Sequence, residues 1–432
     1  MSSRRYFFKS IAYALISAVS ELLPLQAIAS ASAQVNLHDW LAQNKRTFQK
    51  ETLEQVLEFC AKNNSTLFIP GGDYIIDGTV HIPSGTRIQG VKGETKIRYA
   101  GETPQEIFRA DNAYNISFDS LKFHGGMSPD MKEIKFYVRG VRFVSCHDIS
   151  LRNCEINHCA DWHLSFEKCQ NIKVASCSIS GDGDGRPGGR DGIHFLDSSN
   201  ILIRDIEAHT GDDCVAFTVE AGTCENVVVE NIRGTSKIGS VLIFNEERDA
   251  VSSFRNISIR GVTALGEVRD IVRVQAINPG TVISGVSLQD VTGTSRNHAV
   301  FLASLENVEV ANLSIRSIGQ NGLHCISGKG LTLSHVKSAA SDVAFDAIHI
   351  QNCQHVRCFD IDSDLPEGRG ISFIKNLDVK LFNPSFEKLS QIESGNGFAR
   401  SASDASVPQS LRGARFIQNN GLVFVSGTLG ER

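Results

Sequence analysis

The chain has 432 residues, 41% of them hydrophobic, and a mean hydropathy of −0.10. These values describe a soluble chain that can bury a large core, and repeat architectures of this length form one unit. The formal net charge of −5 is small for this size, so we expect no nucleic-acid partner. The 37 glycines against 10 prolines suit a fold with many tight turns.

Residues 1–33 are predicted to be a twin-arginine signal peptide rather than part of the fold. The motif Ser3-Arg4-Arg5-Tyr6-Phe7-Phe8-Lys9 precedes an apolar stretch, and Ala31-Ser32-Ala33 offers a small-residue cleavage site. We therefore expect the twin-arginine export machinery as a partner, a periplasmic or secreted location, and no stable membrane insertion after processing. The alternative is an uncleaved anchor, which Glu21 and Pro24 disfavour.

A helix is predicted over residues 52–61, because Leu53, Val56, Leu57 and Cys60 follow a helical spacing. Thr52 is the expected N-cap. Such a helix would cover the first coil of a sheet and prevent edge-to-edge pairing. Residues 67–72 are then expected to open the first coil.

The most informative pattern is a short phrase that alternates apolar and polar residues and begins with Asn or a small polar residue. Alternation of this kind is the mark of a strand with one buried face. Neighbouring copies between residues 148 and 229, and again between 285 and 331, lie 22–29 residues apart. The copies fall at residues 115–118, 148–151, 171–174, 200–203, 226–229, 256–259, 285–288 and 307–310, with later ones near 331, 356 and 377.

A repeat of this length with one such strand fits one coil of a parallel β-helix, in which stacked coils bury a continuous core. We therefore predict an all-β fold, a single-stranded right-handed parallel β-helix over residues 34–393. Leucine-rich repeats and propellers are disfavoured because their spacings differ. Residues 394–432 are expected to be loop with a possible last strand at 421–425. A buried Asn at each turn is expected to bond the backbone of neighbouring coils.

The eleven cysteines are expected to be mostly small buried hydrophobes. Cys146 and Cys169, like Cys154 and Cys177, are separated by 23 residues and should stack in successive coils. A disulfide between Cys214 and Cys224 stays open at this level.

Three carboxylates form the densest chemical signal. Asp191 precedes Asp212 by 21 residues, close to one coil, so Asp191, Asp212 and Asp213 should lie on one face. Hydrolysis of a glycosidic bond by inversion needs one protonated carboxyl group and one carboxylate that activates water, roughly 6.5–9.5 Å apart. Crowding of like charges raises the pKa of one member and so supplies the acid.

The segment from Asn157 to Gln275 resembles the polygalacturonases, glycoside hydrolase family 28, whose fold is the pectin-lyase-like β-helix. The resemblance rests on Asp161-Trp162-His163-Leu164, Cys169-Gln170-Asn171-Ile172, Asp191-Gly192-Ile193, Gly211-Asp212-Asp213-Cys214, Lys237-Ile238-Gly239-Ser240 and Ile271-Val272-Arg273-Val274-Gln275, in that order. The resemblance implies that Asp212 is the general acid, that Asp191 and Asp213 activate water, and that Arg273 binds substrate.

The sequence departs from the family at three places. Gly189-Arg190-Asp191 stands where the family has Asn-Thr-Asp, and Arg233-Gly234-Thr235 stands at its Gly-His-Gly, so the family histidine is missing. Gln275 replaces a lysine that helps to grip a uronate. A lost cation argues against ordinary polygalacturonase activity, since cations select acidic sugars.

Four further residues near the carboxylates are candidates for substrate binding beside Arg273: Gln275, His194, Arg190 and Lys237. His194 alternates with apolar residues, so packing is the competing interpretation. Trp162 is expected to pack between coils or to stack on a sugar ring. Glu246 and Glu247 are expected in a solvated loop.

The sequence therefore predicts an exported glycoside hydrolase that cleaves a polysaccharide, with or without uronates, by inversion. We expect a monomer and no cofactor, neither metal nor organic. Two other classes stay open: a non-catalytic exopolysaccharide-binding or assembly protein, and a polysaccharide lyase or epimerase on the same fold.

Overall fold

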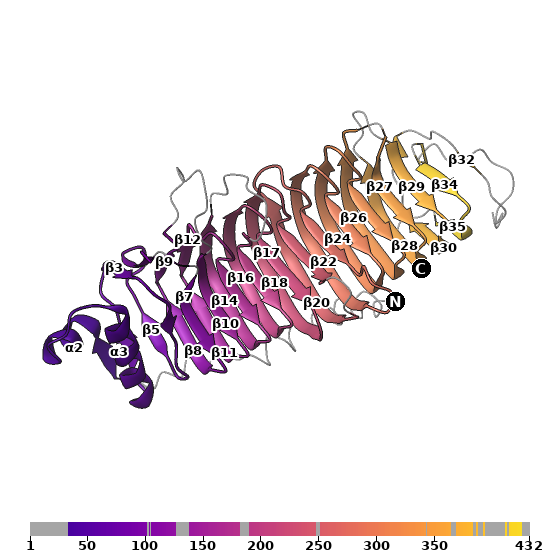
Figure 1. Ribbon diagram of the computed structural model, residues 1–432. Coiled ribbons are helices and arrows are strands. Elements are labelled where there is room, and N and C mark those ends of the chain that lie inside the picture. Colours follow the sequence, from indigo (N-terminus) through magenta and orange to yellow (C-terminus); the bar gives the residue numbers. More distant parts are fainter. Residues whose placement is uncertain are drawn as a thin grey trace, which may run out of the picture.

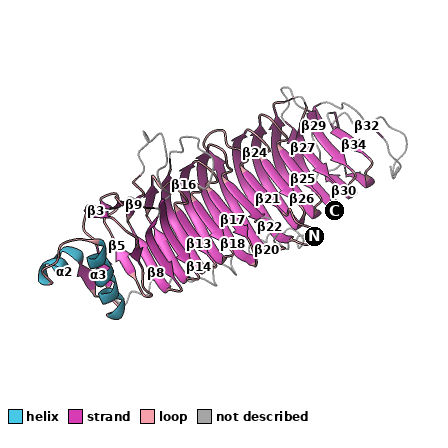
Figure 2. Cartoon of the chain, viewed as in Figure 1, coloured by secondary structure: helices cyan, strands magenta, loops and turns pink. Residues whose placement is uncertain are grey.

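The computed structural model describes residues 33–425, except 102, 104, 127–137, 182–189, 248–250, 343, 364–368, 383–385, 388–391, 394–410 and 413. The predicted signal peptide therefore lies outside the described residues, as does most of the expected loop after residue 393. The described chain forms one elongated stack of parallel strands with two helices at its amino-terminal end (Figures 1 and 2).

Two long parallel sheets run along this stack. The 19-stranded sheet contains β1 (Gln34–Asn36), β2 (Thr66–Phe68), β3 (Gly72–Ile76), β5 (Arg87–Gln89), β6 (Thr95–Tyr99), β8 (Tyr114–Asp119), β9 (Lys122–His124), β11 (His147–Arg152), β12 (Glu155–Asn157), β14 (Gln170–Ser180), β16 (Ser199–Thr210), β18 (Thr223–Ser236), β20 (Ser253–Ala264), β22 (Val282–Ser295), β24 (Leu305–Ser317), β26 (Lys329–Ala340), β28 (Gln354–Ser363), β30 (Leu377–Phe382) and β35 (Asn420–Val425).

The 14-stranded sheet contains β4 (Val80–His81), β7 (Gln105–Asp111), β10 (Val138–Val144), β13 (Leu164–Glu167), β15 (Ile193–Leu196), β17 (Val215–Val219), β19 (Leu242–Glu246), β21 (Val272–Gln275), β23 (Val300–Ala303), β25 (Leu323–Ile326), β27 (Asp346–Gln351), β29 (Arg369–Ile374), β32 (Ile392–Glu393) and β34 (Ala414–Ile417). A short pair, β31 (Phe386–Glu387) and β33 (Leu411–Arg412), lies apart from both sheets.

The predicted parallel β-helix is confirmed, and the repeated phrase sets its register. Ile149 pairs with Ile172, Ile172 with Ile201, and Ile201 with Val227. The same pairing continues through Val308 and Leu331. Each coil contributes one strand, or rung, to a sheet. The apolar positions of each rung therefore lie directly over those of the rung before. At the carboxyl-terminal end, β34 pairs with β29 and β35 pairs with β30, so both sheets continue into the last described strands.

The recurring Asn has a different cause from the expected one. Asp148, Asn171, Asn200, Asn226 and Asn256 all have φ between 55° and 58°, a left-handed conformation that Asn and Asp tolerate better than other non-glycine residues. Their side chains bond one another rather than the backbone, as in the 2.9 Å bond that Asn226 Nδ2 donates to Asn200 Oδ1. They are at least partly exposed, so the prediction of a buried Asn is wrong for this column.

Stacked phenylalanines fill the core behind the middle of the 14-stranded sheet. Phe143, Phe166, Phe195, Phe217 and Phe244 form one column, with ring centroids 4.3–5.1 Å apart and interplanar angles of 1–10°. All five side chains are fully buried. Because large side chains in close contact leave no room to shift, this column fixes strands β10 to β19 against one another.

The cysteines behave as predicted. All eleven are free and buried, and the Cys146 amide donates to Cys169 Sγ in the next rung. Cys214 and Cys224 are both free thiols, so no disulfide joins them.

The amino-terminal cap differs in detail from its prediction. Helix α3 (Lys50–Lys62) buries Leu53, Val56, Leu57 and Cys60 as expected, but its N-cap is Gln49. Thr52 lies within the first turn, where its hydroxyl accepts a 2.8 Å bond from the Gln49 amide. A further helix, α2 (Leu37–Gln43), and strand β1 precede it and were not predicted. No helix in the described part of the chain is long and apolar enough to cross a bilayer.

Candidate active site

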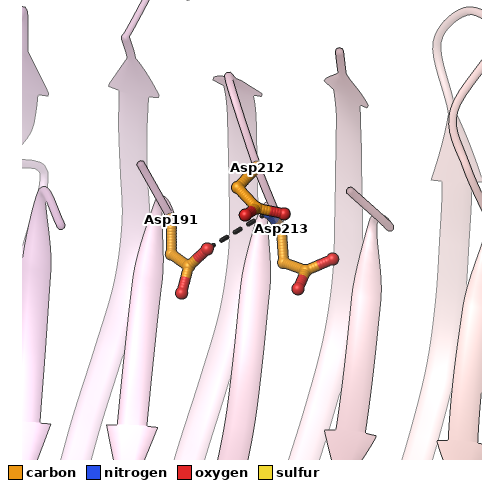
Figure 3. Close-up of side chains that lie close together, drawn as sticks. All are labelled: Asp191, Asp212 and Asp213. Carbon is orange, nitrogen blue, oxygen red and sulfur yellow. Dashed lines mark hydrogen bonds between the residues drawn. The ribbon is translucent and has the colours of Figure 1, made fainter. Parts of the chain in front are cut away.

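Three aspartates meet where the chain enters two neighbouring strands of the 14-stranded sheet. Asp191 stands two residues before β15 and Asp213 two residues before β17, and Ile193 pairs with Val215. One oxygen from each of Asp191, Asp212 and Asp213 lies within 4.8 Å of the others. Figure 3 shows the three side chains side by side, with the 3.2 Å bond from the Asp213 amide to Asp191 Oδ1 drawn as a dashed line.

One oxygen from each carboxyl group lies nearer to the others than the gap of roughly 6.5–9.5 Å that is expected between catalytic carboxyl groups. Their nearest oxygens lie within 4.8 Å, because the residues occupy adjacent rungs and neighbouring strands of a sheet are only about 4.7–4.9 Å apart. Distance alone therefore gives no support for inversion.

Asp191 is a buried carboxylate with both oxygens bonded. Its Oδ2 lies 2.6 Å from Nδ1 of His194, and its Oδ1 accepts the Asp213 amide. Nε2 of His194 lies 2.7 Å from the Thr218 hydroxyl. The His194 side chain is 5% exposed, and its ring stacks on Trp162 with centroids 3.8 Å apart.

Both ring nitrogens of His194 thus have hydrogen-bond partners, and one of them supports Asp191. Substrate binding by His194 stays a prediction. The Trp162 ring makes two contacts within the protein. It stacks on His194, and the Arg139 guanidinium lies 4.3 Å from its centroid. Coil packing is therefore the interpretation of Trp162 that the contacts favour.

Asp213 is held by a cation that no sequence motif had singled out. Nη2 of Arg269 lies 3.2 Å from Asp213 Oδ1 and donates to the Ser240 hydroxyl at 2.9 Å. The Ser240 amide donates to the same Asp213 oxygen at 2.5 Å. Nε of Arg269 bonds Asp270, which is fully buried. Arg269 was missed because its side chain arrives from a turn two rungs away, outside the repeated phrase.

Crowding and burial perturb two of the three carboxyl groups. Burial, and next the charge of Asp191, raise the pKa of Asp213 to about 7, although Arg269 opposes the shift. The same two causes raise the pKa of Asp212. Three carboxyl groups this close cannot all ionise at the ordinary aspartate pKa, so the cluster retains a proton into the neutral range.

The backbone around Asp212 and Asp213 is fixed by hydroxyl groups and by a glycine. The Thr210 and Ser236 hydroxyls donate to the Asp212 carbonyl oxygen at 2.6 and 2.7 Å. A Cβ on Gly239 would lie 2.4 Å from the Asp213 nitrogen, closer than real Cβ contacts allow. Only glycine therefore lets the next turn pack against this peptide.

The predicted substrate-binding residues lie at different depths. Arg273 is 23% exposed in its side chain, and it is oriented by Gln275 Oε1 at 2.9 Å, by Asp270 Oδ2 at 3.2 Å and by the ring of Phe301. Gln275 thus holds Arg273. Lys237 is exposed, whereas Arg190 is 2% exposed and its side chain does not face solvent.

Glu246 is also placed differently from its prediction. It lies at the end of β19, is 1% exposed, and accepts the amides of Ile277 and Asn278 at 2.5 Å each. The expectation of a solvated loop is therefore wrong for Glu246, because its carboxylate caps the turn after β21.

The fold and these residues together define a parallel β-helix with an acidic centre on its 14-stranded sheet. Residues 122–292 match the family described as "Glycosyl hydrolases family 28". This segment includes the three aspartates, Arg269 and Arg273. The chain is thus similar to that family through the middle of its β-helix.

The chain is also similar to individual known proteins. A probable rhamnogalacturonase A of Aspergillus oryzae is 24% identical over 303 residues, 65% of this chain and 61% of that protein. A polygalacturonase of Arabidopsis thaliana is 33% identical over 95 residues, 22% of this chain and 19% of that protein. The chain thus spans less than two thirds of the length of these relatives. The polygalacturonase structure from Erwinia carotovora has a TM-score of 0.50 and 13% identity over 74% of this chain and 93% of that one, which shows the shared fold.

The raised pKa of Asp213 predicts a pH-dependent cost to stability. A carboxyl group with a pKa of about 7 when folded, against an ordinary value of 3.8 when unfolded, keeps its proton only in the folded protein between these values. Its contribution therefore falls as pH rises from about 4 to 7 and is constant above. We expect the free energy of unfolding of Asp213→Asn, relative to wild type, to increase between about pH 4.5 and 8 in denaturant titrations. A difference that is equal at both pH values would contradict the shift.

Proposed function

We propose that the protein is an exported glycoside hydrolase that cleaves a pectin-type polysaccharide at the Asp191, Asp212 and Asp213 cluster. The observation that carries the proposal is the meeting of three carboxyl groups, two with raised pKa values, inside the segment that matches family 28. A retained proton beside carboxylates is what acid- and base-assisted cleavage of a glycosidic bond requires. The names of the relatives, a rhamnogalacturonase and a polygalacturonase, support a galacturonate-containing substrate.

Asp212 is the proposed proton donor to the leaving oxygen. Its side chain is partly exposed, and among the described residues no arginine forms a hydrogen bond with it. Asp213, in contrast, has Arg269 and the Ser240 amide to stabilise its ionised form. The cluster retains one proton near neutral pH, and Asp212 and Asp213 share it. We place this proton on Asp212 during the reaction, because Asp213 is then ionised beside Arg269 and the Ser240 amide.

Asp191 and Asp213 are the proposed acceptors of the water proton. Both oxygens of Asp191 and one oxygen of Asp213 are already hydrogen-bonded, which weakens either group as a nucleophile toward carbon. A water held between them attacks instead, and one displacement by water inverts the anomeric carbon. Asp213 Oδ2 is the oxygen left to take the proton.

Arg273 is the proposed contact for a substrate carboxylate. Gln275, Asp270 and Phe301 fix its orientation, and a guanidinium fixed in this way loses little entropy when it binds an anion. Lys237, exposed after β18, offers a second cation. The proposed roles require neither a metal nor an organic cofactor.

Replacement of the proposed acid tests this assignment. Asp212→Asn removes the proton donor, so we expect turnover to fall by about 10²–10⁴-fold, the usual contribution of general acid catalysis. Release of reducing ends from rhamnogalacturonan and polygalacturonate is followed by proton NMR, which also identifies the anomer formed first; we expect inversion. Asp205→Asn, an exposed aspartate on the other sheet, is the matched control and should match wild type. Unchanged turnover in Asp212→Asn, or first release of the retained anomer, would refute the proposed roles.

Export by the twin-arginine route is proposed on the residues of the amino-terminal segment. The pattern Arg4-Arg5 with a following apolar stretch supports it. The eleven free, buried cysteines are also consistent with folding in a reducing compartment before export. We expect replacement of Arg4 and Arg5 by Lys to hold the full-length protein in the cytoplasmic fraction, whereas Lys9→Arg leaves export intact. Equal amounts of wild type and the double variant outside the cytoplasm would disprove the route.

A further inference from the structure

A cavity of about 710 Å³, largely open to solvent, lies at the amino-terminal end of the same sheet, away from the three aspartates. Its walls are the turn of residues 77–79, which leads into β4, the first turn of α3, and the start and end of β7. Cavities of about 300–1,000 Å³ are the usual size of small-molecule sites. This space is therefore large enough for a sugar unit.

The cavity lies in line with the acidic centre. Glu106, in its wall, pairs across the sheet with Arg139, and the Arg139 guanidinium lies over Trp162. Trp162 in turn stacks on His194, the partner of Asp191. Three rungs thus separate the cavity wall from Asp191, or about 14 Å at the spacing of parallel strands. Arg139 and Trp162 therefore lie between the cavity wall and Asp191 along the sheet.

The charged residues that line the cavity favour an uncharged sugar over a uronate. Two cations, Lys50 and Arg109, face four carboxylates, Glu51, Asp77, Glu106 and Asp111, which leaves an excess of two negative charges. Both cations are also already paired, Lys50 with Glu54 at 3.0 Å and Arg109 with Asp111 at 2.7 Å. A uronate in this space would meet unfavourable like charge, whereas the hydroxyl groups of an uncharged sugar donate to carboxylates.

Neutral hydrogen-bonding groups complete the wall. The Thr79 amide and hydroxyl both donate to Gln105 Oε1, at 2.8 and 3.0 Å, so the turn that frames the cavity is fixed before a ligand arrives. The opposite side of the acidic centre carries Arg269 and Arg273 instead. Arg139 and Arg142 stand on the cavity side of the aspartates, where they pair with Asp161, Glu106 and Glu167. The excess of carboxylates therefore belongs to the cavity lining itself.

We propose that this cavity is a distal subsite for an uncharged sugar unit of the polysaccharide, three rungs from the bond that is cleaved. The proposal rests on the proposed function, and it adds that the substrate backbone contains neutral sugars, with any uronate placed on the Arg273 side. Chains of galacturonate alone fit this arrangement less well than chains in which uronate and neutral units are mixed.

Filling the cavity provides the test. A Cβ on Gly78 would make only ordinary contacts, 3.7 Å to Gln105 Oε1 and 3.8 Å to Lys50 Cδ, so Gly78→Leu can occupy the space without displacing the turn. We expect this variant to raise KM for polymeric rhamnogalacturonan by about tenfold, the loss of one modest contact set. Its kcat, and its kinetics on rhamnogalacturonan oligosaccharides too short to reach the cavity, should not change. Gly78→Ala is the matched control and should resemble wild type on both substrates.

A charge variant tests the selectivity. Asp77→Asn reduces the excess negative charge, so we expect it to lower KM for polygalacturonate by several-fold at low salt, with less effect on rhamnogalacturonan. An unchanged ratio between the two polymers would contradict selection by charge.

Two outcomes overturn the proposal. One is an unchanged KM for the polymer in Gly78→Leu, and the other is an equal loss on short and long substrates. If wild type cleaves neither polymer, the proposed function fails. The subsite proposal is then tested by the retardation of the protein in gels that contain rhamnogalacturonan. Wild type retarded more than Gly78→Leu supports it, whereas equal retardation or none for wild type refutes it.

Discussion

The fixed spacing between rungs is the constraint on which the rest of this protein depends. Parallel strands pair at about 4.7–4.9 Å, and the pairing of Ile193 with Val215 transfers that spacing to the residues that precede each strand. Asp191 and Asp213 are thereby held side by side at a distance that free carboxylates would avoid. Burial, and next the charge of Asp191 that this spacing brings close, raise the pKa values of Asp212 and Asp213.

The surroundings offset this unfavourable crowding. His194 and the Asp213 amide bond the Asp191 carboxylate, and Arg269 and Ser240 bond Asp213. Behind the strands, the column of stacked phenylalanines leaves no free volume through which the rungs could relax. Charge that is costly in a flexible loop is therefore kept in place by a rigid scaffold, as preorganised polar sites require.

The periodic part of the structure was the part open to prediction from sequence. Strand register followed from the alternating phrase, and the near one-coil offset correctly brought Asp191 beside Asp212 and Asp213. The reason for the recurring Asn was misjudged, because alternation does not reveal which turn residue has positive φ. Contacts that depend on the direction of a side chain were also missed. Arg269 reaches Asp213 from a non-repeating turn, and the closure of His194 against Trp162 and Thr218 appears only in three dimensions.

The central claim is that burial and rung spacing together make the three aspartates share a proton near neutral pH. The most direct measurement is an NMR titration of wild-type protein with carboxyl-¹³C-labelled aspartate, assigned with single Asn variants of Asp191, Asp212 and Asp213. We expect one resonance of the cluster to titrate with a pKa of about 7, as Asp213 indicates, well above the ordinary aspartate value of about 3.9. Titration of all three carboxyl groups below about pH 5 would show that they ionise independently, and would contradict the claim.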